Sequence, residues 1–380
     1  MSTARSQLRP GLPVDYYAPD YRIEIKKQVI DPETRGDVID LKVKLLKDNI
    51  GSFQLTINNW DDKLLAFKHS DSDTFALGNE VHVKLGYVGN MVSVMRGIVT
   101  SLAPQFPESG PPTLAVGCQD SLIKLKGRKP TEGEQKKYVD MCDWEIAQAV
   151  AKRNGLRFKG TQQGPQHELV MQKNQDDAQF LIERAKRIDY DCFIEVDPDT
   201  GDDTLSFIKP TDGRDGRPIR VYTFEWGKSL INFSPTLTLA NQVGKVTVRG
   251  WDPRTKQAIH YTATKEDLPS LPSVGPSGPG TAEKQMNDKQ DVVVDRPVFS
   301  TEEARHLAIS LLRERAKLFM TGSGQVIGLA DLRPGDNVEI KNLGERFSGV
   351  YEVTQVDHSL GGGGFTTRFE VRHPYAGGAA

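Results

Sequence analysis

A two-part pattern that occurs twice, far apart in the chain, most constrains how this sequence can fold. Each copy joins a strand ending in Trp-Asp to a later Gly-led turn that feeds a strand of alternating polarity. The first copy has Trp60-Asp61 and then Gly78, and the second has Trp251-Asp252 and then Gly335. Two copies predict two β-barrels of one design, with the tryptophans at equivalent corners and the two glycines equivalent. Such a chain presents nearly equivalent surfaces twice, which favours a structural protein over an enzyme.

The composition bounds the remaining possibilities. With 380 residues the chain is long enough for two to four domains. Its 49 Lys+Arg and 51 Asp+Glu nearly cancel, so no overall attraction to nucleic acid is expected. No stretch approaches the roughly 20 apolar residues of a membrane-spanning helix, so we expect no stable membrane insertion. The three cysteines match neither a disulfide framework nor a Cys-x-x-Cys metal site, and with no signal peptide visible, cytosolic synthesis is expected.

Alternation of apolar and polar residues predicts the first barrel. The polar segment 1–15, with two prolines, is expected to be a flexible arm. Within residues 16–129, period-two alternation is clear in Leu41–Leu45, Phe53–Ile57 and Val81–Leu85. This period is typical of half-buried antiparallel strands, and several of them predict a small barrel.

The period changes to that of helices in residues 130–215. Asp143 and Asp176 each stand before a segment with an apolar face, so both are expected to cap helices. Strands are predicted at Cys192–Val196 and Leu205–Ile208. The segment is therefore expected to be an α+β insert domain.

The second barrel is predicted in two pieces, at residues 216–266 and 322–376. Between them, residues 267–299 are rich in Pro, Ser and Gly and are expected to form a long loop with little regular structure. The Ser-Thr-Glu-Glu sequence at 300–303 predicts a capping box opening a helix over 300–321. Pro334-Gly335 predicts a turn before the last strands.

The residue pattern does not predict a catalytic centre. The seven histidines form no His-x-x-x-His spacing, and the acidic runs at 61–62, 176–177 and 197–203 fall where turns and caps are expected. Trp60 and Trp251 fit a shared barrel feature better than ligand stacking. The basic run Lys124–Lys129 fits a solvated face, with contact to an acidic partner as the alternative. We assign no catalytic, cofactor-binding or metal-binding residue.

The order of these parts resembles the phage late control gene D family. The helix and strand over 176–194, with Phe180-Leu181 and Tyr190, resemble a recurring segment of these proteins, although Asp189 stands where the family usually has Gly. The resemblance covers roughly residues 20–375. It also includes the late helix and the turn at 333–336. The family includes baseplate hub proteins of contractile phage tails and the N-terminal hub region of VgrG spikes in type VI secretion.

The resemblance implies a mainly β fold with α+β inserts, built from two tudor-like barrels and smaller α/β domains. It implies a homotrimer that joins a threefold spike to a sixfold tail tube in a phage tail, tailocin or injection particle. The partners would be the tail tube protein, other baseplate proteins and a separate spike protein, because the sequence stops before any needle. Two alternatives from other classes stay open: a tail-tip cell-wall hydrolase and a monomeric glycan-binding module.

Overall fold

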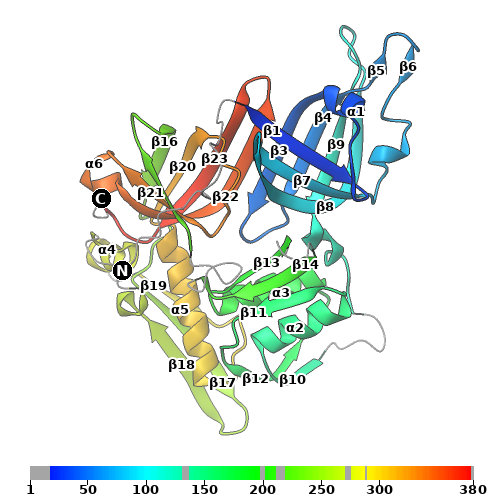
Figure 1. Cartoon of the computed structure of the whole chain (residues 1–380). Helices are drawn as coiled ribbons and strands as arrows, with labels where there is room; N and C mark the ends of the chain where they lie inside the picture. Colours follow the sequence, from blue (N-terminus) through cyan, green and yellow to red (C-terminus); the bar gives the residue numbers. More distant parts are fainter. Residues whose placement is uncertain are drawn as a thin grey trace.

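The chain is mainly β, with large antiparallel sheets and few helices. The computed structural model describes residues 18–130, 137–196, 202–210, 219–269, 275–286 and 289–377. Two barrel-like units lie side by side, and two smaller α/β units lie on one side of them (Figure 1). The predicted flexible arm, residues 1–15, lies outside the described residues.

The first barrel-like unit is a curved antiparallel sheet in the order β1-β7-β8-β9-β4-β3. Alternating apolar side chains from these strands fill one core, which includes Leu55, Val83 and Leu114. Its strands are β1 (Pro19–Ile25), β3 (Val38–Leu46), β4 (Ser52–Asn58), β7 (Glu80–Tyr87), β8 (Asn90–Gln105) and β9 (Thr113–Asp120). Short elements at its margins are β2 (Gln28–Val29), α1 (Pro32–Gly36), β5 (Trp60–Asp61), β6 (Ala66–Phe67), η1 (Asp73–Phe75) and η2 (Ser121–Lys124).

The second barrel-like unit repeats this strand order, as β15-β21-β22-β23-β20-β16. Each strand has a counterpart at the same place in the first unit, although β15 pairs with β21 in parallel while β1 pairs with β7 antiparallel. Its elements are β15 (Val221–Glu225), β16 (Leu230–Leu237), β20 (Met320–Ile327), β21 (Asn337–Lys341), α6 (Gly344–Phe347), β22 (Gly349–Gly361) and β23 (Gly364–His373).

The repeat extends to the glycine turns. Gly78 and Gly335 both adopt positive φ, at 85° and 91°, a region that a Cβ disfavours. The Gly78 N–H donates to the carbonyl of Val99 at 2.8 Å, and the Gly335 N–H donates to that of Val353 at 2.7 Å. The predicted equivalence of the two glycines is therefore confirmed.

The two barrels also share their irregularities. Each has a β-bulge one residue after the valine that faces the glycine turn, at Thr100 and Thr354. Both threonine hydroxyls donate to a carbonyl on the neighbouring strand. The last strand in each sheet order is also bulged at matching points, at Ile39 in β3 and Ile231 in β16. Matching bulges fix the residue-by-residue equivalence of the two sheets.

The barrels join into one continuous sheet. β22 pairs with β3 from Gln355↔Leu46 to Gly361↔Asp40, antiparallel. The side chain of Tyr87 also reaches across, donating from its hydroxyl to the carbonyl of Gly328 at 2.9 Å. We call this strand pair the internal junction.

Between the barrels in sequence lies an α+β unit. Asp176 caps α3 as predicted, accepting from the Gln179 N–H at 2.8 Å. The prediction that Asp143 caps a helix is wrong by one position, because Asp143 is the first residue of α2 and Cys142 is its N-cap. The apolar faces of both helices are buried with the strands. Its elements are β10 (Lys137–Cys142), α2 (Asp143–Arg153), β11 (Arg157–Gly160), β12 (Gln166–Met171), α3 (Asp177–Arg187), β13 (Asp191–Val196) and β14 (Asp203–Ile208). We call it the insert.

A second α/β unit interrupts the second barrel, so the prediction that residues 216–266 all belong to that barrel is wrong. Of the strands in this range only β15 and β16 belong to the barrel, because β17 pairs with β18 on one edge and with β19 on the other. The buried stripe of α5 covers this separate sheet. The elements are β17 (Lys245–Asp252), β18 (Gln257–Ala263), η4 (Lys265–Asp267), α4 (Gly278–Gln285), β19 (Gln290–Val293) and α5 (Thr301–Lys317). We call it the α5 unit.

Two boundary predictions are also corrected by this unit. Residues 267–299 were expected to lack regular structure, but they contain α4, capped by Ser277, and β19, which gains a partner in β17. The helix expected over 300–321 ends at Lys317, because Met320 already pairs with β16 and β23.

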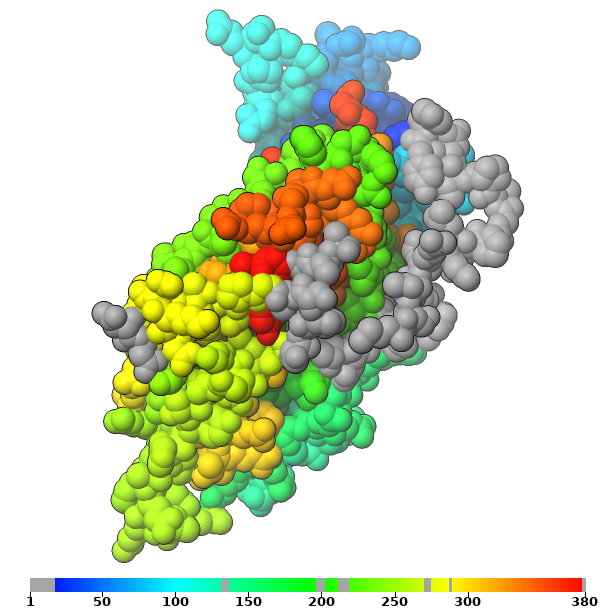
Figure 2. Space-filling view, turned by 90° about the vertical axis from the view of Figure 1, so that its left-hand side faces the viewer, coloured from blue at the N-terminus to red at the C-terminus, as the bar shows by residue number. Residues whose placement is uncertain are grey.

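The prediction that Trp60 and Trp251 occupy equivalent barrel corners is wrong. Each instead stands directly before the turn of a hairpin with the same turn chemistry: Asp61 accepts from the Lys63 N–H at 2.8 Å, and Asp252 accepts from the Arg254 N–H at 2.8 Å. The first hairpin belongs to barrel one and the second to the α5 unit. The Trp-Asp pattern is a local turn signal and not part of the domain-level repeat, since Asp side chains favour such turns in any hairpin. Both hairpins project at the ends of the molecule (Figures 1 and 2).

Candidate functional site

A buried network of charges lies where all four units meet. Lys47, at the end of β3, is 4% exposed. Its ammonium lies 3.0 Å from a carboxylate oxygen of Asp191 in the insert and also binds Glu352 in β22. Arg372 in β23 donates from Nε to Glu352 at 2.9 Å. Lys317 in α5 lies 3.8 Å from the same carboxylate. We call these five residues the central junction.

Burial and charge act against each other in the central junction. Burial alone would raise the pKa of Glu352, but Lys47, Lys317 and Arg372 hold it well below its ordinary value. Burial would lower the pKa of Lys47, but Asp191 and Glu352 raise it. Asp191 keeps a raised pKa because its desolvation outweighs the attraction of Lys47. A buried pair of this kind fixes geometry more than it adds stability, so the network orients the four units relative to one another.

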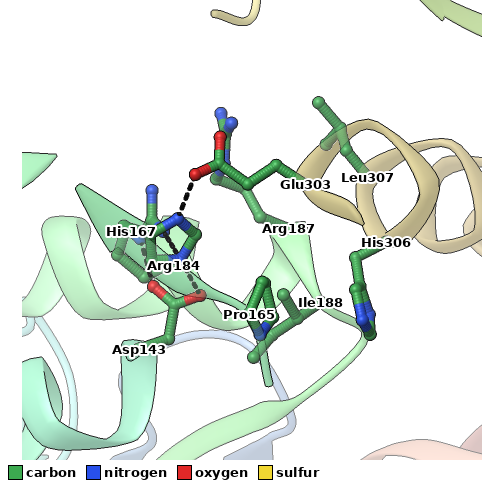
Figure 3. A pocket seen from close by; sticks show the side chains of 9 residues that line it. All are labelled: Asp143, Pro165, His167, Arg184, Arg187, Ile188, Glu303, His306 and Leu307. Carbon is green, nitrogen blue, oxygen red and sulfur yellow. Dashed lines mark hydrogen bonds and ion pairs between the residues drawn. The ribbon is translucent and has the colours of Figure 1, made fainter. Parts of the chain in front are cut away.

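A second buried cluster joins the insert to the α5 unit (Figure 3). His167 of β12 uses both ring nitrogens: Nδ1 lies 2.7 Å from Glu303 in α5, and Nε2 lies 3.0 Å from Asp143 in α2. Arg184 of α3 also binds Asp143. The cavity beside this cluster has a volume of about 10 Å³, which is room for about one water molecule. We call these four residues the histidine latch.

The histidine latch holds its charges by mutual contact. Burial alone would lower the pKa of His167, but its hydrogen bonds to Asp143 and Glu303 raise it, against a smaller opposing effect of Arg184. Burial would raise the pKa values of Asp143 and Glu303, but Arg184 lowers the first and His167 lowers the second. Because both imidazole nitrogens already face carboxylates, the arrangement suits a structural contact better than proton transfer to a substrate.

The acidic runs of the sequence have local contacts where the structure describes them. Asp61 and Asp176 accept backbone N–H groups at a turn and a helix start. Asp203 lies 3.2 Å from Lys124 of η2, which ties the basic run to the insert. Residues 197–201 lie outside the described part. Within the described ranges, no group of three or more His, Cys, Asp or Glu could hold a metal ion. In the same ranges no helix is long and apolar enough to cross a membrane.

Exposed apolar side chains mark two surfaces. At the tip of barrel one, the Phe67 ring lies 5.4 Å from both Trp60 and Phe106, between ring centroids, and Leu64 and Leu65 stand beside Trp60 on the same hairpin, largely exposed. We call these five residues the aromatic tip.

The second surface is the ribbon of β10 and β12. It exposes Val139, Leu169 and Met171, and the first two are direct partners across the ribbon. Contiguous exposed apolar groups of this kind are typical of interaction sites.

The sequence did not indicate the central junction or the histidine latch. Lys47 and Glu352 are 305 positions apart, and His167 and Glu303 are 136 apart, so no local spacing connects them. The Ser-Thr-Glu-Glu capping box did identify Glu303 as a helix-start residue, and its second oxygen accepts from the Phe299 N–H at 2.9 Å. Only the tertiary fold brings His167 to its other oxygen.

Comparison with known proteins places the chain in a family. Residues 20–361 match the model of the Alg8 N-terminal domain, and the chain belongs to that family. This model bears a different name from the late control gene D family of the sequence analysis. No curated protein matches the chain.

Solved structures share the fold at low sequence identity. A 43 kDa tail protein of prophage MuSo2 from Shewanella oneidensis superposes with a TM-score of 0.67 at 13% identity, covering 94% of this chain and 99% of that one. A tail protein from Neisseria meningitidis gives 0.66 at 13%, covering 94% and 97%. An E. coli component of the type VI secretion system gives 0.57 at 12%, covering 94% and 79%. The hub-like fold expected from the sequence is therefore confirmed.

Proposed function

We propose that this chain of the Alg8 N-terminal domain family is a non-enzymatic structural baseplate hub of a contractile tail or injection system. In this proposal a homotrimer joins a threefold spike to a sixfold tail tube. The protein is synthesised in the cytoplasm and assembled there into the particle. We expect the protein to act by binding partners through its surface, because the charged groups of each buried cluster already pair with one another.

The internal repeat carries the proposal. Two six-stranded units share strand order, glycine turns and bulges. Three chains with two such units each would supply six nearly equivalent barrels, which is what a sixfold tube requires from a threefold partner. The likeness to tail proteins of two bacteria supports the same assignment.

The two apolar surfaces suggest which faces meet which partners. The aromatic tip lies at the free end of barrel one, on the side away from the insert (Figure 1), and it is our candidate for contact with the tube or with another baseplate protein. The β10–β12 ribbon lies on the opposite side, and its exposed Val139, Leu169 and Met171 make it the candidate contact for a separate spike chain. Each contact would need to bury at least about 1,000 Å² to be stable.

The test is a reconstruction of the native particle tip, computed without imposed symmetry. We expect three copies between spike and tube, with the six barrels facing the tube and the inserts facing the spike. One copy, six identical copies, or a place on the sheath or tail fibres would overturn the proposal.

The aromatic tip also favours a second candidate function, a glycan-binding module, because exposed aromatic rings stack on sugar faces. Titration of the purified protein with cell-surface glycans tests it. Binding that is lost in Trp60→Ala and kept in Trp251→Ala would support the module, and absence of binding in the wild-type protein would reject it.

A further inference from the structure

Each of the two strands that form the internal junction has a counterpart whose outer edge is open in the described part of the chain. In that junction β22 of barrel two pairs with β3 of barrel one. Under the repeat, β8 is the counterpart of β22, and β16 is the counterpart of β3. The outer end of β8 and residues 232–237 of β16 therefore present, at opposite ends of the joined sheet, the two halves of a second junction.

These two edges are open in the described part of the chain. Residues 101–105 of β8 pair with β9 on one side only, and residues 232–237 of β16 pair with β20 on one side only. Both segments lack charged side chains, reading Ser-Leu-Ala-Pro-Gln and Asn-Phe-Ser-Pro-Thr-Leu. An uncharged open edge is a template for another strand unless some feature blocks it.

The bulges transfer the register of the internal junction to these edges. Because Thr100 matches Thr354, Pro104 is the counterpart of His358. Because Ile39 matches Ile231, Pro235 is the counterpart of Val43. His358 and Val43 are direct partners in the internal junction. The second junction would therefore place Pro104 opposite Pro235.

At the rung of Pro104 and Pro235, an antiparallel ladder requires a backbone N–H from each strand. The Lys47 N–H donates to the Thr354 carbonyl across the internal junction at 3.0 Å. Hydrogen-bonded pairs alternate along an antiparallel ladder, so the pair four residues further, His358 and Val43, also exchanges hydrogen bonds. Proline has no N–H, and its ring occupies the space of the missing hydrogen. Two prolines at one rung remove both hydrogen bonds and hold the strands apart.

We propose that the β8 edge of one copy faces the β16 edge of a second copy in the register of the internal junction, and that Pro104 and Pro235 weaken this contact. The inference rests on the proposed function, since it names the contact between copies in the ring. The contact is head-to-tail, so at full strength it would link copies into rings or open filaments. The paired prolines confine its formation to the particle, where spike and tube add their own binding.

The first test restores the missing donors. Pro104→Val and Pro235→Val are combined, and self-association of the full chain is measured by sedimentation equilibrium. We expect a dissociation constant at least about tenfold lower than that of the wild-type chain, with each single variant between them, because two backbone hydrogen bonds return. Pro253→Val, in an exposed loop of the α5 unit, is the matched control and should change nothing. An unchanged constant in the double variant would overturn the proposal.

The second test checks the register. Ala103 and Thr236 correspond to Asp357 and Lys44, a non-hydrogen-bonded pair of the internal junction, where Cβ atoms lie about 4.5–5.5 Å apart. Cysteines at both positions in the double proline variant should give disulfide-linked oligomers on a non-reducing gel. Ala103→Cys with Asn232→Cys, four residues out of register, should not, and each single cysteine variant measures the background of the native thiols. Equal linking by both pairs would overturn the register.

The particle reconstruction separates this inference from the proposed function. Three copies at the hub that touch through other surfaces would overturn the edge contact and leave the hub role standing. A chain located elsewhere would overturn the hub role.

Discussion

At the scale of single residues, two glycines at equivalent positions form the turn that precedes a strand in each barrel. Gly78 and Gly335 take positive φ, and each lies just before one of two equivalent strands, β7 and β21. Space around Gly78 is open, with nothing within 4 Å of an added Cβ. A substitution there tests backbone strain without a side-chain clash.

Gly78→Ala should lower the free energy of unfolding by about 1–2 kcal/mol, because alanine resists the left-handed region. Gly335→Ala should lower it by a similar amount. Gly362→Ala, at a hairpin tip with equally open surroundings and no positive φ, should change it little. Urea denaturation of the three variants measures this, and equal stability of all three would contradict the role given to the turns.

The histidine latch predicts a pH dependence of stability. The raised pKa of His167 makes its contribution fully present below the unfolded value of about 6.5 and lost as pH rises through the folded value. The lowered pKa values of Asp143 and Glu303 make theirs present above about pH 4 and lost as pH falls through the folded values. The latch is therefore strongest between about pH 4.5 and 6.5.

His167→Gln should consequently lose the most stability, relative to wild type, near pH 6, and the difference should narrow toward pH 9. Chemical denaturation at a series of pH values measures this. His306→Gln is the control: this residue lines the same cavity but has a pKa lowered by burial, so it should lose no stability at pH 6. A wild-type advantage that grows above pH 8 would contradict the sign.

At the scale of elements, the central junction decides how strands and helices of different units meet. Lys47 directly follows β3, Asp191 begins β13, and Glu352 lies in β22, so three units depend on one ammonium group. Removing one member leaves the others buried with an uncompensated charge, which is the costly case for a buried ion pair.

Lys47→Met and Glu352→Gln should each lower the free energy of unfolding by about 3–5 kcal/mol. The double variant should lose clearly less than the sum, because the two side chains share one interaction. Lys228→Met removes an exposed ion pair with Glu225 and should change stability by less than about 1 kcal/mol. Additive losses in the double variant would show that the two charges do not act together.

At the scale of the whole molecule, the four units are connected by a shared sheet and by buried charged contacts. The internal junction makes one sheet of both barrels. The central junction ties both α/β units to this sheet, and the histidine latch ties the two α/β units to each other. Four cores that share these contacts are expected to unfold together despite the length of the chain.

Thermal or urea unfolding should therefore give coincident transitions when followed by far-ultraviolet circular dichroism and by tryptophan fluorescence. Lys47→Met should separate the two curves, since the junction between units is weakened first. Two distinct transitions in the wild-type protein would mean that the units are energetically independent.

The sequence by itself determined the local features. Period-two alternation located three strands of the first barrel, Asp143 and Asp176 marked helix starts, and the Gly-led turns identified a true repeat. These features depend on backbone conformation and on side-chain contacts within a few residues, which are written directly in the order of amino acids.

Only the tertiary structure decided which strands share a sheet. β17 has the alternation of a barrel strand, yet it joins the α5 unit because β18 and β19 fill its edges. The Trp-Asp signal is likewise the same in two unrelated hairpins, and the partners of Lys47 and His167 come from distant parts of the chain. Pairing between distant segments depends on which faces and edges remain unfilled after local structure has formed. Local periodicity does not determine which distant segment will fill them.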